Sequence, residues 1–526
     1  MFRSPRRSIL GLSALFGISL VHSASAAGLY VSDSGVRANG RGTAFVAGAD
    51  DALAMAYNPA GIVFAGNSIL ADFTYVSYST TFTRQTQVLD AQGGPHVYSF
   101  PTVNGKAPFL PIPFIGATFA LDAAKKWSAG LSIQAPHAGL LSYPDKVDNG
   151  PAPQRYSLIN LDGSALVALG GTIATKPLPW LAVGLGLEML VGKFASQVTF
   201  SANPNDRFIG APEDPKYDAQ SQLTAGPILS PSANAGVVLL PTPWLRFGAA
   251  FVLPFVVNSG ATIQVRLPEA ALFSNARQDG DAARVVFTLP AKLNLGVEVR
   301  PVPALRLEVS FSRQFWSAHE TIDIRPRNVA LLGVTGFPEP FYVGNISLQR
   351  RFTDANSFRL GGEYNVRIND TSSLDLRLGV RYDQSAVPIA YLTPLTVDLD
   401  HVTASIGAGY KFHPRWRIDA QFSKLFTSET FVDPAIAKVS RVNPVQGNPT
   451  ATDAVNGGTY SVDSFTLGVG VNYAWDTAGE VAAASKPDEE KSDASNSDDE
   501  KVSPSKAPSQ VETAPKTPAL REKPRY

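Results

Sequence analysis

The chain of 526 residues contains no cysteine. Disulfide bonds, thiolate metal sites and cysteine nucleophiles are therefore excluded. Charge is also scarce, since Asp, Glu, Lys and Arg make up 17% of the residues, against roughly 25% in an average soluble domain. The 45 basic residues equal the 45 acidic residues in number, so no excess positive charge is available to bind a nucleic acid.

Long apolar runs are missing beyond the N-terminus. A membrane-spanning helix needs ~20 consecutive apolar residues, and only the first 26 residues approach that pattern. They begin with three arginines, continue with an apolar stretch and end in small residues up to Ala26. This order predicts a secretory signal peptide over residues 1–26, with a membrane-anchor helix as the alternative.

Alternation of apolar residues with small or polar residues dominates the rest of the chain. Residues 181–192, 293–300 and 305–312 place Leu, Val, Met or Phe at every second position. A period of two predicts β-strands. A transmembrane barrel turns its apolar face to lipid and its small or polar face to the lumen, but a soluble sandwich alternates too. The lengths of the connections between strands must therefore distinguish a barrel from a sandwich.

Short and long connections alternate along the chain. Short breaks lie near residues 123–125, 177–179, 241–243, 301–303, 369–371 and 413–414. Longer polar stretches lie near residues 84–111, 139–154, 201–226, 268–281, 327–345, 388–395 and 430–457. Outer-membrane barrels show this asymmetry, with short periplasmic turns and long outward loops. We therefore predict an all-β fold, a fourteen-stranded antiparallel transmembrane β-barrel over residues 67–475, in a Gram-negative outer membrane.

Two segments flank this predicted barrel. Residues 27–66 contain one helical candidate, Ala49–Tyr57, and enough apolar side chains to pack, which predicts a plug (hatch) in the barrel lumen. Residues 476–526 are rich in charge, Ser and Pro and predict a disordered tail. An even strand number places both termini in the periplasm. The tail is then a passive solvated segment or a contact for a periplasmic partner.

Residues 40–62, with the sequence GRGTAFVAGADDALAMAYNPAGI, and the preceding Gly28-Leu29-Tyr30 resemble the FadL-type outer-membrane transporters. The most specific match is Asn58-Pro59-Ala60-Gly61, because that family carries an Asn-Pro-Ala tip on its plug. The resemblance covers residues 27–475. It implies passive, plug-gated uptake of hydrophobic molecules, with long-chain fatty acids as the first expectation and aromatic hydrocarbons as the alternative.

The resemblance also implies roles for individual residues. Asn58, Pro59, Ala60 and Gly61 would form the gating tip of the plug, and the alternative is a helix stop with no moving part. The tip would approach a break in the third strand. Pro136 and Gly139 are our candidates for that break in the barrel wall, and the alternative is the ordinary end of a strand.

Two further sets of residues are candidate ligand contacts. Arg155, beside Tyr156, opens the predicted fourth strand, and the resemblance implies that it meets the head group of a fatty acid. The alternative is a rim arginine that binds lipopolysaccharide or an acidic loop residue. Phe109, Leu110 and Phe114 are interleaved with prolines and predict an apolar lip, unless they simply pack a loop or begin the second strand.

Catalytic chemistry has little support in the sequence. Asp398 and Asp400 would share one face of a predicted strand, and His401 would lie on the other, so the three do not form an activated nucleophile. We expect no enzyme, no cofactor and no metal site. The partners expected are a hydrophobic small molecule and the outer-membrane lipid with its lipopolysaccharide, around a monomer. A structural or adhesive barrel and an open polar porin are the rival interpretations.

Overall fold

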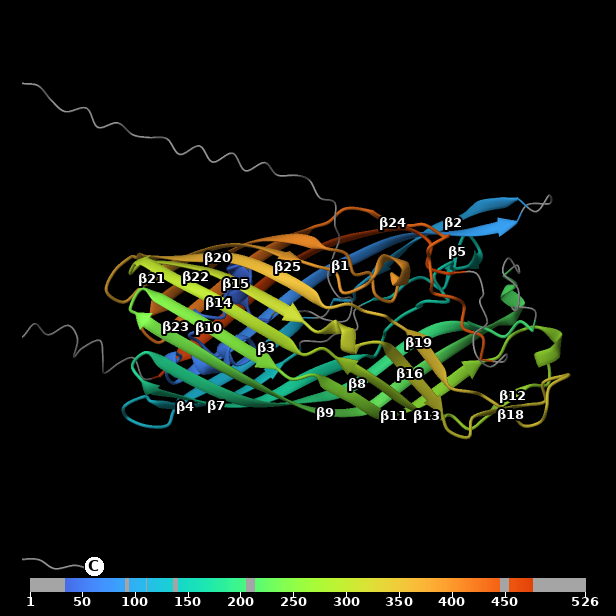
Figure 1. Cartoon of the computed structure of the whole chain (residues 1–526), viewed down its shortest axis with the longest axis horizontal. Coiled ribbons are helices and arrows are strands. Elements are labelled where there is room, and N and C mark those ends of the chain that lie inside the picture. The colour runs from blue at the N-terminus through green and yellow to red at the C-terminus, as the bar shows by residue number, and fades with distance from the viewer. Residues whose placement is uncertain are drawn as a thin grey trace, which may run out of the picture. The chain divides into compact units, whose positions relative to one another are not determined.

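The computed structural model describes residues 34–89, 94–109, 111–135, 141–204, 213–444 and 454–475. The predicted signal peptide and tail lie outside the described residues, as do Leu110, Pro136 and Gly139. One antiparallel sheet of twenty strands dominates the chain (Figure 1). Within the described ranges, no helix is both long enough and apolar enough to cross a membrane.

The twenty strands make fourteen staves, where a stave is one complete crossing of the barrel wall by the chain. Eight staves are single strands: β1 (Ser68–Leu89), β4 (Trp127–Gln134), β7 (Ala165–Leu178), β8 (Leu181–Ser201), β9 (Asp218–Thr242), β21 (Ser373–Asp383), β22 (His401–His413) and β25 (Gly458–Ala474). The other six staves each join two consecutive strands: β2 (Pro95–Lys106) with β3 (Pro111–Ala120), β10 (Leu245–Val252) with β11 (Phe255–Arg266), β13 (Ala282–Leu289) with β14 (Lys292–Val302), β15 (Leu305–Gln314) with β16 (Thr321–Pro326), β19 (Ile346–Gln349) with β20 (Ala355–Arg367), and β23 (Trp416–Phe426) with β24 (Thr430–Val432).

The sheet closes on itself. β1 pairs with β25 from Ser68 opposite Ala474 to Arg84 opposite Gly458, so the first and last staves are neighbours. The predicted fourteen-stranded barrel is thereby confirmed. Closure pairs the backbone groups of both edges, which a sheet in hydrocarbon requires because no water is available there.

The six short turns predicted from the sequence all connect consecutive staves at one end of the barrel, on the left in Figure 1. The longer connections lie at the opposite end and carry the small strands β5 (Lys146–Val147), β6 (Gly150–Pro151), β12 (Arg277–Asp279), β17 (Ala330–Leu332) and β18 (Phe341–Tyr342), and the short 3₁₀ turns η2 (Pro215–Tyr217), η3 (Ala271–Phe273) and η5 (Ile389–Tyr391). A further 3₁₀ turn, η4 (Trp316–Ala318), interrupts the stave formed by β15 and β16. The predicted loop at 84–111 is wrong in part, because β1 and β2 continue through most of it as a paired ribbon.

The alternation in sequence becomes two different surfaces. On β8, Leu185 and Leu187 face outward and are 63% and 72% exposed, whereas Glu188 and Leu190 face inward and are buried. The outward surface is therefore apolar, as contact with lipid demands. The inward surface is mixed and must be filled by other parts of the chain.

The plug fills the half of the lumen near the short turns. It consists of α1 (Val36–Gly40), α2 (Ala54–Tyr57) and η1 (Pro59–Phe64), and nearly all its residues are buried (Figure 1). The helix predicted over Ala49–Tyr57 is shorter than expected. Asp51 accepts the backbone N–H of Leu53 at 3.0 Å, but Asp50 turns away to an arginine, so the segment before Ala54 does not become helical.

The wall is hollowed where it meets the plug. Gly184 of β8 lies opposite Gly236 of β9, and a Cβ atom added at Gly184 would come within 2.5 Å of the backbone of Pro59 and Ala60. These two glycines thus give the plug room to approach the strands. Any side chain at either position must displace the plug.

We therefore predict that Gly184→Val loosens the plug. Overpacking typically costs roughly 1–3 kcal/mol, and here the clash is with backbone, which yields less than a side chain. Entry of a small sugar into liposomes carrying the variant should become several-fold faster. Gly260→Val is the matched control, because a Cβ atom there meets nothing within 4 Å. Equal rates for the two variants would contradict the prediction.

Candidate functional site

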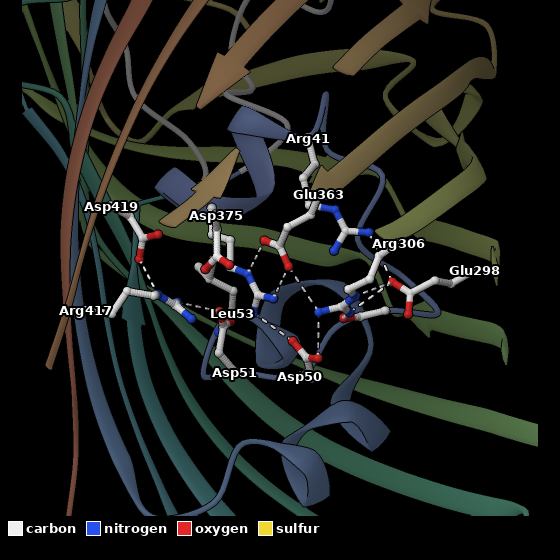
Figure 2. Close-up of polar contacts among 12 residues, drawn as sticks. Arg41, Asp50, Asp51, Leu53, Glu298, Arg306, Glu363, Asp375, Arg417 and Asp419 are labelled. Atoms are coloured by element: carbon white, nitrogen blue, oxygen red, sulfur yellow. Dashed lines mark hydrogen bonds and ion pairs between the residues drawn. The ribbon is translucent and has the colours of Figure 1, made fainter. Parts of the chain in front are cut away.

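The plug is tied to the barrel wall by a network of buried ion pairs (Figure 2). Arg37 of α1 donates to Asp50 at 2.7 Å, to Asp51 at 3.0 Å and, through two nitrogen atoms, to Glu363 of β20 at 2.8 and 3.0 Å. Arg306 of β15 lies 2.9 Å from Asp50. The plug therefore supplies a cation to a carboxylate of the wall, and the wall supplies a cation to a carboxylate of the plug.

The wall residues are linked to one another as well. Arg377 bridges Glu363 and Asp419, each at 2.6 Å, and Arg417 bridges Asp419 at 2.7 Å and Asp51 of the plug at 3.2 Å. Figure 2 shows Arg417, Asp419 and Asp51 on one side of the cluster. Removing one partner of such a buried pair leaves an uncompensated charge and is strongly destabilising.

A carboxylate from the wall also holds the plug backbone. Glu308 of β15 accepts the N–H groups of Val46, Ala47 and Gly48 at 2.5, 3.1 and 2.9 Å. Arg41 of the plug is fully buried and pairs with Glu298 at 3.1 Å. The plug segment 46–48 is thus fixed by hydrogen bonds that do not depend on side chains of its own.

The charges of the plug are stable near neutral pH. Burial alone would raise the pKa of Asp50, but the guanidinium groups of Arg306 and Arg37 outweigh it and hold that pKa well below its usual range. Burial would lower the pKa of Arg37, and Glu363 and Asp50 more than reverse this effect. Asp50 and Arg37 therefore remain ionised, and this half of the lumen is filled by charged side chains.

The predicted tip of the plug lies against β8 and β9. Asn58 is fully buried and donates through Nδ2 to the carbonyl oxygens of Val46 and Val237, each at 3.0 Å, and its Oδ1 accepts the N–H of Ala60 at 3.2 Å. Pro59, Ala60 and Gly61 are buried beside it. The tip is therefore a built contact with the wall, and nothing in it is exposed.

The other half of the lumen, toward the long loops, contains a large buried apolar cluster beside buried charges such as Arg84 and Arg155. The cluster includes large side chains from most staves, among them Phe194, Phe287, Trp316, Phe352 and Tyr460. A narrow pocket inside it is lined by Phe194, Ser196, Val198, Phe200, Ser221, Leu223, Ile263, Ile322, Ile324, Leu348 and Leu395. Its cavity volume is only about 20 Å³. Side chains must move aside before any ligand larger than a water molecule can enter.

One cation stands at the edge of this pocket. Arg350 follows the lining residue Leu348 by two positions on the inward face and is 5% exposed. Its Nη2 donates to Thr396 at 3.0 Å, and its guanidinium lies 5.1 Å from the centre of the Phe352 ring. Within the described ranges no carboxylate lies within ion-pair distance of Arg350, and its Nε has no hydrogen-bond partner. The sequence analysis did not single out this residue.

Arg155 is placed differently from the prediction. β7 begins at Ala165, so Arg155 and Tyr156 do not open the fourth stave but lie in the connection before it. That connection folds inward because Tyr156, Leu158 and Ile159 are buried. The bridge from the N–H of Ile159 to the carbonyl of Gln197, at 2.8 Å, fixes it beside β8.

Arg155 is already neutralised. Its Nε donates to Asp218 at 2.7 Å and its Nη2 lies 3.4 Å from Glu213. Burial raises the pKa of Tyr156 well above its usual value, so its neutral hydroxyl donates to Asp218 at 2.7 Å. Arg84 also binds Glu213. Two carboxylates thus occupy the donors that a ligand head group would need.

The predicted apolar lip does not form one surface. Phe114 lies in β3, is 1% exposed and belongs to the apolar cluster under the plug, so its assignment to the lip is wrong. Phe109 is 78% exposed, with its ring 5.0 Å from that of Tyr75 on β1. The two phenylalanines separate because β3 begins at Pro111 and alternates its side chains between the two faces.

The wall is irregular near the predicted break. β4 ends at Gln134, opposite Phe114 of β3 and Ala168 of β7, while β3 and β7 each continue past it. Pro136 and Gly139, the candidates for the break, lie outside the described residues. Farther along, Ser142 bridges Lys106 and Asn160, which restores a connection between β2 and β8.

Asp398 and Asp400, near His401, form hydrogen bonds within the chain. Asp398 and Asp400 lie before β22 and not within a strand, so the predicted shared strand face is wrong. Asp398 accepts the N–H of Ala386 at 2.8 Å, and burial raises its pKa to about 8. Among the described residues, no group of three or more His, Asp or Glu side chains could hold a metal ion.

Comparison with known proteins identifies the family. The model of the family described as "Outer membrane protein transport protein (OMPP1/FadL/TodX)" matches residues 17–475. The chain belongs to this family. It is an outer-membrane transport protein and not an enzyme.

Individual relatives agree with this assignment. The "Outer membrane protein P1" of Haemophilus influenzae is 23% identical over 469 residues, which cover 80% of this chain and 89% of the relative. A FadL homologue from Pseudomonas aeruginosa has the same fold, with a TM-score of 0.62 at 18% identity over 85% of this chain and 99% of the homologue. The toluene transporter TodX of P. putida has a TM-score of 0.56 at 15% identity, over 84% of this chain and 99% of TodX.

We predict that Glu363→Gln destabilises the docked plug. The substitution leaves Arg37, Arg306 and Arg377 around a neutral amide, and breaking a buried ion pair typically costs about 3–5 kcal/mol. Hydrogen exchange in residues 34–66 should accelerate by at least a hundredfold. The control is Glu320→Gln, whose partner Arg351 is exposed, and which should cost less than about 1 kcal/mol. Unchanged exchange in Glu363→Gln would show that the network does not hold the plug.

Proposed function

We propose that this protein takes up long-chain fatty acids passively through the outer membrane. The observation that supports this cargo is Arg350, a buried cation that lies at the edge of an apolar pocket and has no carboxylate partner in the part of the chain that the structure describes. An anionic head group would pair with the guanidinium, and an acyl chain would fill the apolar cluster. Burial of each methylene contributes roughly 0.8 kcal/mol, so a long chain supplies ample binding energy.

Arg350 suits this role better than Arg155. A ligand carboxylate at Arg155 would have to displace Asp218 and Glu213, whereas at Arg350 it would displace only the hydroxyl of Thr396. An uncompensated buried charge is costly, and a ligand that neutralises it gains that free energy back. Arg155 remains the second candidate for the head-group contact, and the variants below distinguish the two.

The short-turn end lies in the periplasm in this proposal, and cargo enters from the long-loop end. Its way along the lumen is blocked by the charged network of the plug, which an apolar chain cannot cross. The tip at Asn58-Pro59-Ala60-Gly61 is the part we propose to move, because it is held by only a few hydrogen bonds and lies outside the ion-pair network. Cargo opens it only to the extent that it binds the open state more tightly than the closed state. The wall beside the end of β4, next to Pro136 and Gly139, is the exit that we propose.

Arg350→Met should weaken oleate binding at least tenfold and oleyl alcohol binding less than threefold. The reason is that a hydrogen bond to a charged group contributes about 1.5–3 kcal/mol, and the alcohol cannot use the charge. Equilibrium binding to the detergent-purified barrel measures both ligands. Arg351→Met, next in the chain but exposed, is the matched control.

The same assay tests the alternatives. Arg155→Ala should affect oleate and oleyl alcohol equally, and a selective loss of oleate would move the head-group contact to Arg155. Preferential binding of toluene over oleate would favour an aromatic hydrocarbon as cargo, the substrate class named for the P. putida relative. Binding of neither compound would favour a structural barrel.

Movement of the tip can be tested with a single cysteine, since the chain has none of its own. Ala60 is fully buried, and Ala60→Cys should react with a maleimide at least ten times faster when oleate is bound. Ala52→Cys, buried in the plug against β3, should not change. The gating role is refuted if oleate alters neither rate, and a rise at both positions would show that the whole plug moves.

A further inference from the structure

A row of glutamines crosses three neighbouring strands near the long loops. Gln222 of β9 lies directly opposite Gln197 of β8 on one side and Gln264 of β11 on the other. Together they line an open groove of about 640 Å³. The rest of its lining is Gln220, Val265, Arg266, Gln278, Gly280 and Asp281.

The glutamine groove faces outward. On β11 the alternate residue Ile263 lines the apolar pocket inside the barrel, so Gln264 points to the outside. Gln197 has the same parity along β8 as Leu187 and Met189, which are exposed on the lipid-facing surface. The groove is therefore separate from the lumen and from the proposed cargo site.

The glutamine groove lies beyond the apolar band. Gln197 follows Met189 by eight residues, and at ~3.3 Å per residue with a strand tilt of ~40° this places it roughly 20 Å farther from the membrane centre. Lys193 is exposed halfway between them. The order along β8 is thus apolar, basic and then neutral polar.

The chemistry of the glutamine groove favours a sugar. Each glutamine amide offers donors and acceptors without charge, which matches hydroxyl groups better than phosphates or hydrocarbon. Gln197 accepts from Asn160 at 2.6 Å and Gln278 donates to the carbonyl of Ile263 at 2.8 Å, so both are held in place. Gln220 and Gln264 make no side-chain hydrogen bond to the described part of the chain and are free to bind.

We propose that the glutamine groove binds the saccharide part of lipopolysaccharide, the glycolipid of the outer leaflet. The sequence of surfaces on β8 matches that molecule, with acyl chains beside Met189, a phosphate beside Lys193 and sugars at Gln197. This inference rests on the proposed orientation, with the long loops outside the cell. The bound glycolipid would anchor the barrel wall beside the proposed cargo entrance.

The test is binding of rough lipopolysaccharide to the detergent-purified full chain, with the double variant Gln222→Ala/Gln264→Ala. We expect binding at least fivefold weaker in the variant, with unchanged heat stability of the barrel. Gln349→Ala is the control, since Gln349 is an outward-facing, exposed glutamine on β19, away from the groove. Lipid A, which lacks the core oligosaccharide, should bind the wild-type chain and the double variant equally.

Three results would overturn the proposal: equal lipopolysaccharide binding by the double variant, full binding of lipid A alone, or binding of the free core oligosaccharide as tight as that of the intact glycolipid. The last would mean that the groove serves a soluble sugar. Orientation is checked separately by labelling Ala271→Cys on intact cells with an impermeant maleimide. Its failure would refute the orientation, whereas the binding results report on the groove itself.

Discussion

Closure of the hydrogen-bond ladder between β1 and β25 is the constraint on which the rest of the structure depends. In a hydrocarbon environment every backbone N–H and C=O needs a partner within the protein, and only a closed sheet supplies one for each edge. Once the sheet is closed, the pleat fixes which residues face lipid and which face the lumen. Lipid requires an apolar outside, so polar and small residues are left to line an interior that must then be filled.

The interior is filled in two chemically different ways. Near the short turns the plug contributes Arg37, Asp50 and Asp51 to a network with wall residues such as Glu363 and Arg417, and charge excludes a hydrophobic passage. Near the long loops the lumen holds a large cluster of buried apolar side chains. The tip at Asn58 meets β8 and β9 at Gly184 and Gly236, within the half of the lumen that the plug fills.

The division of roles also explains why the plug contains both rigid and weak contacts. The ion pairs are buried, and removing one partner leaves an unpaired charge, so this part of the plug stays in place. The tip is held by ordinary hydrogen bonds from Asn58 and by close contact with Gly184 and Gly236. In the proposed gating, a change of a few kcal/mol on cargo binding would shift the tip without releasing the network.

Much of the architecture could be predicted from the sequence because it depends on local patterns. Period-two alternation, the Pro-rich or polar breaks and the counts of short and long connections were enough for fourteen staves, since strand pleat and turn chemistry act over a few residues. The Asn58-Pro59 motif likewise marked the plug. The start of helix α2 at Ala54 could not be predicted, because Asp50 pairs with Arg306, which is distant in the sequence.

The functional residues were harder to predict, since their roles depend on what surrounds them. Nothing in the sequence around Arg155 or Arg350 tells which of them is paired. The fold places two carboxylates on Arg155 and, among the residues that the structure describes, none on Arg350. The sequence predicted Phe114 as a lip residue, but its position in β3 places its side chain inside the barrel. The sequence by itself determined the barrel, its strand number and its family, because these follow from local periodicity and short motifs. Only the tertiary structure decided which charges are paired and which are left for a ligand, because pairing joins residues that lie tens to hundreds of positions apart.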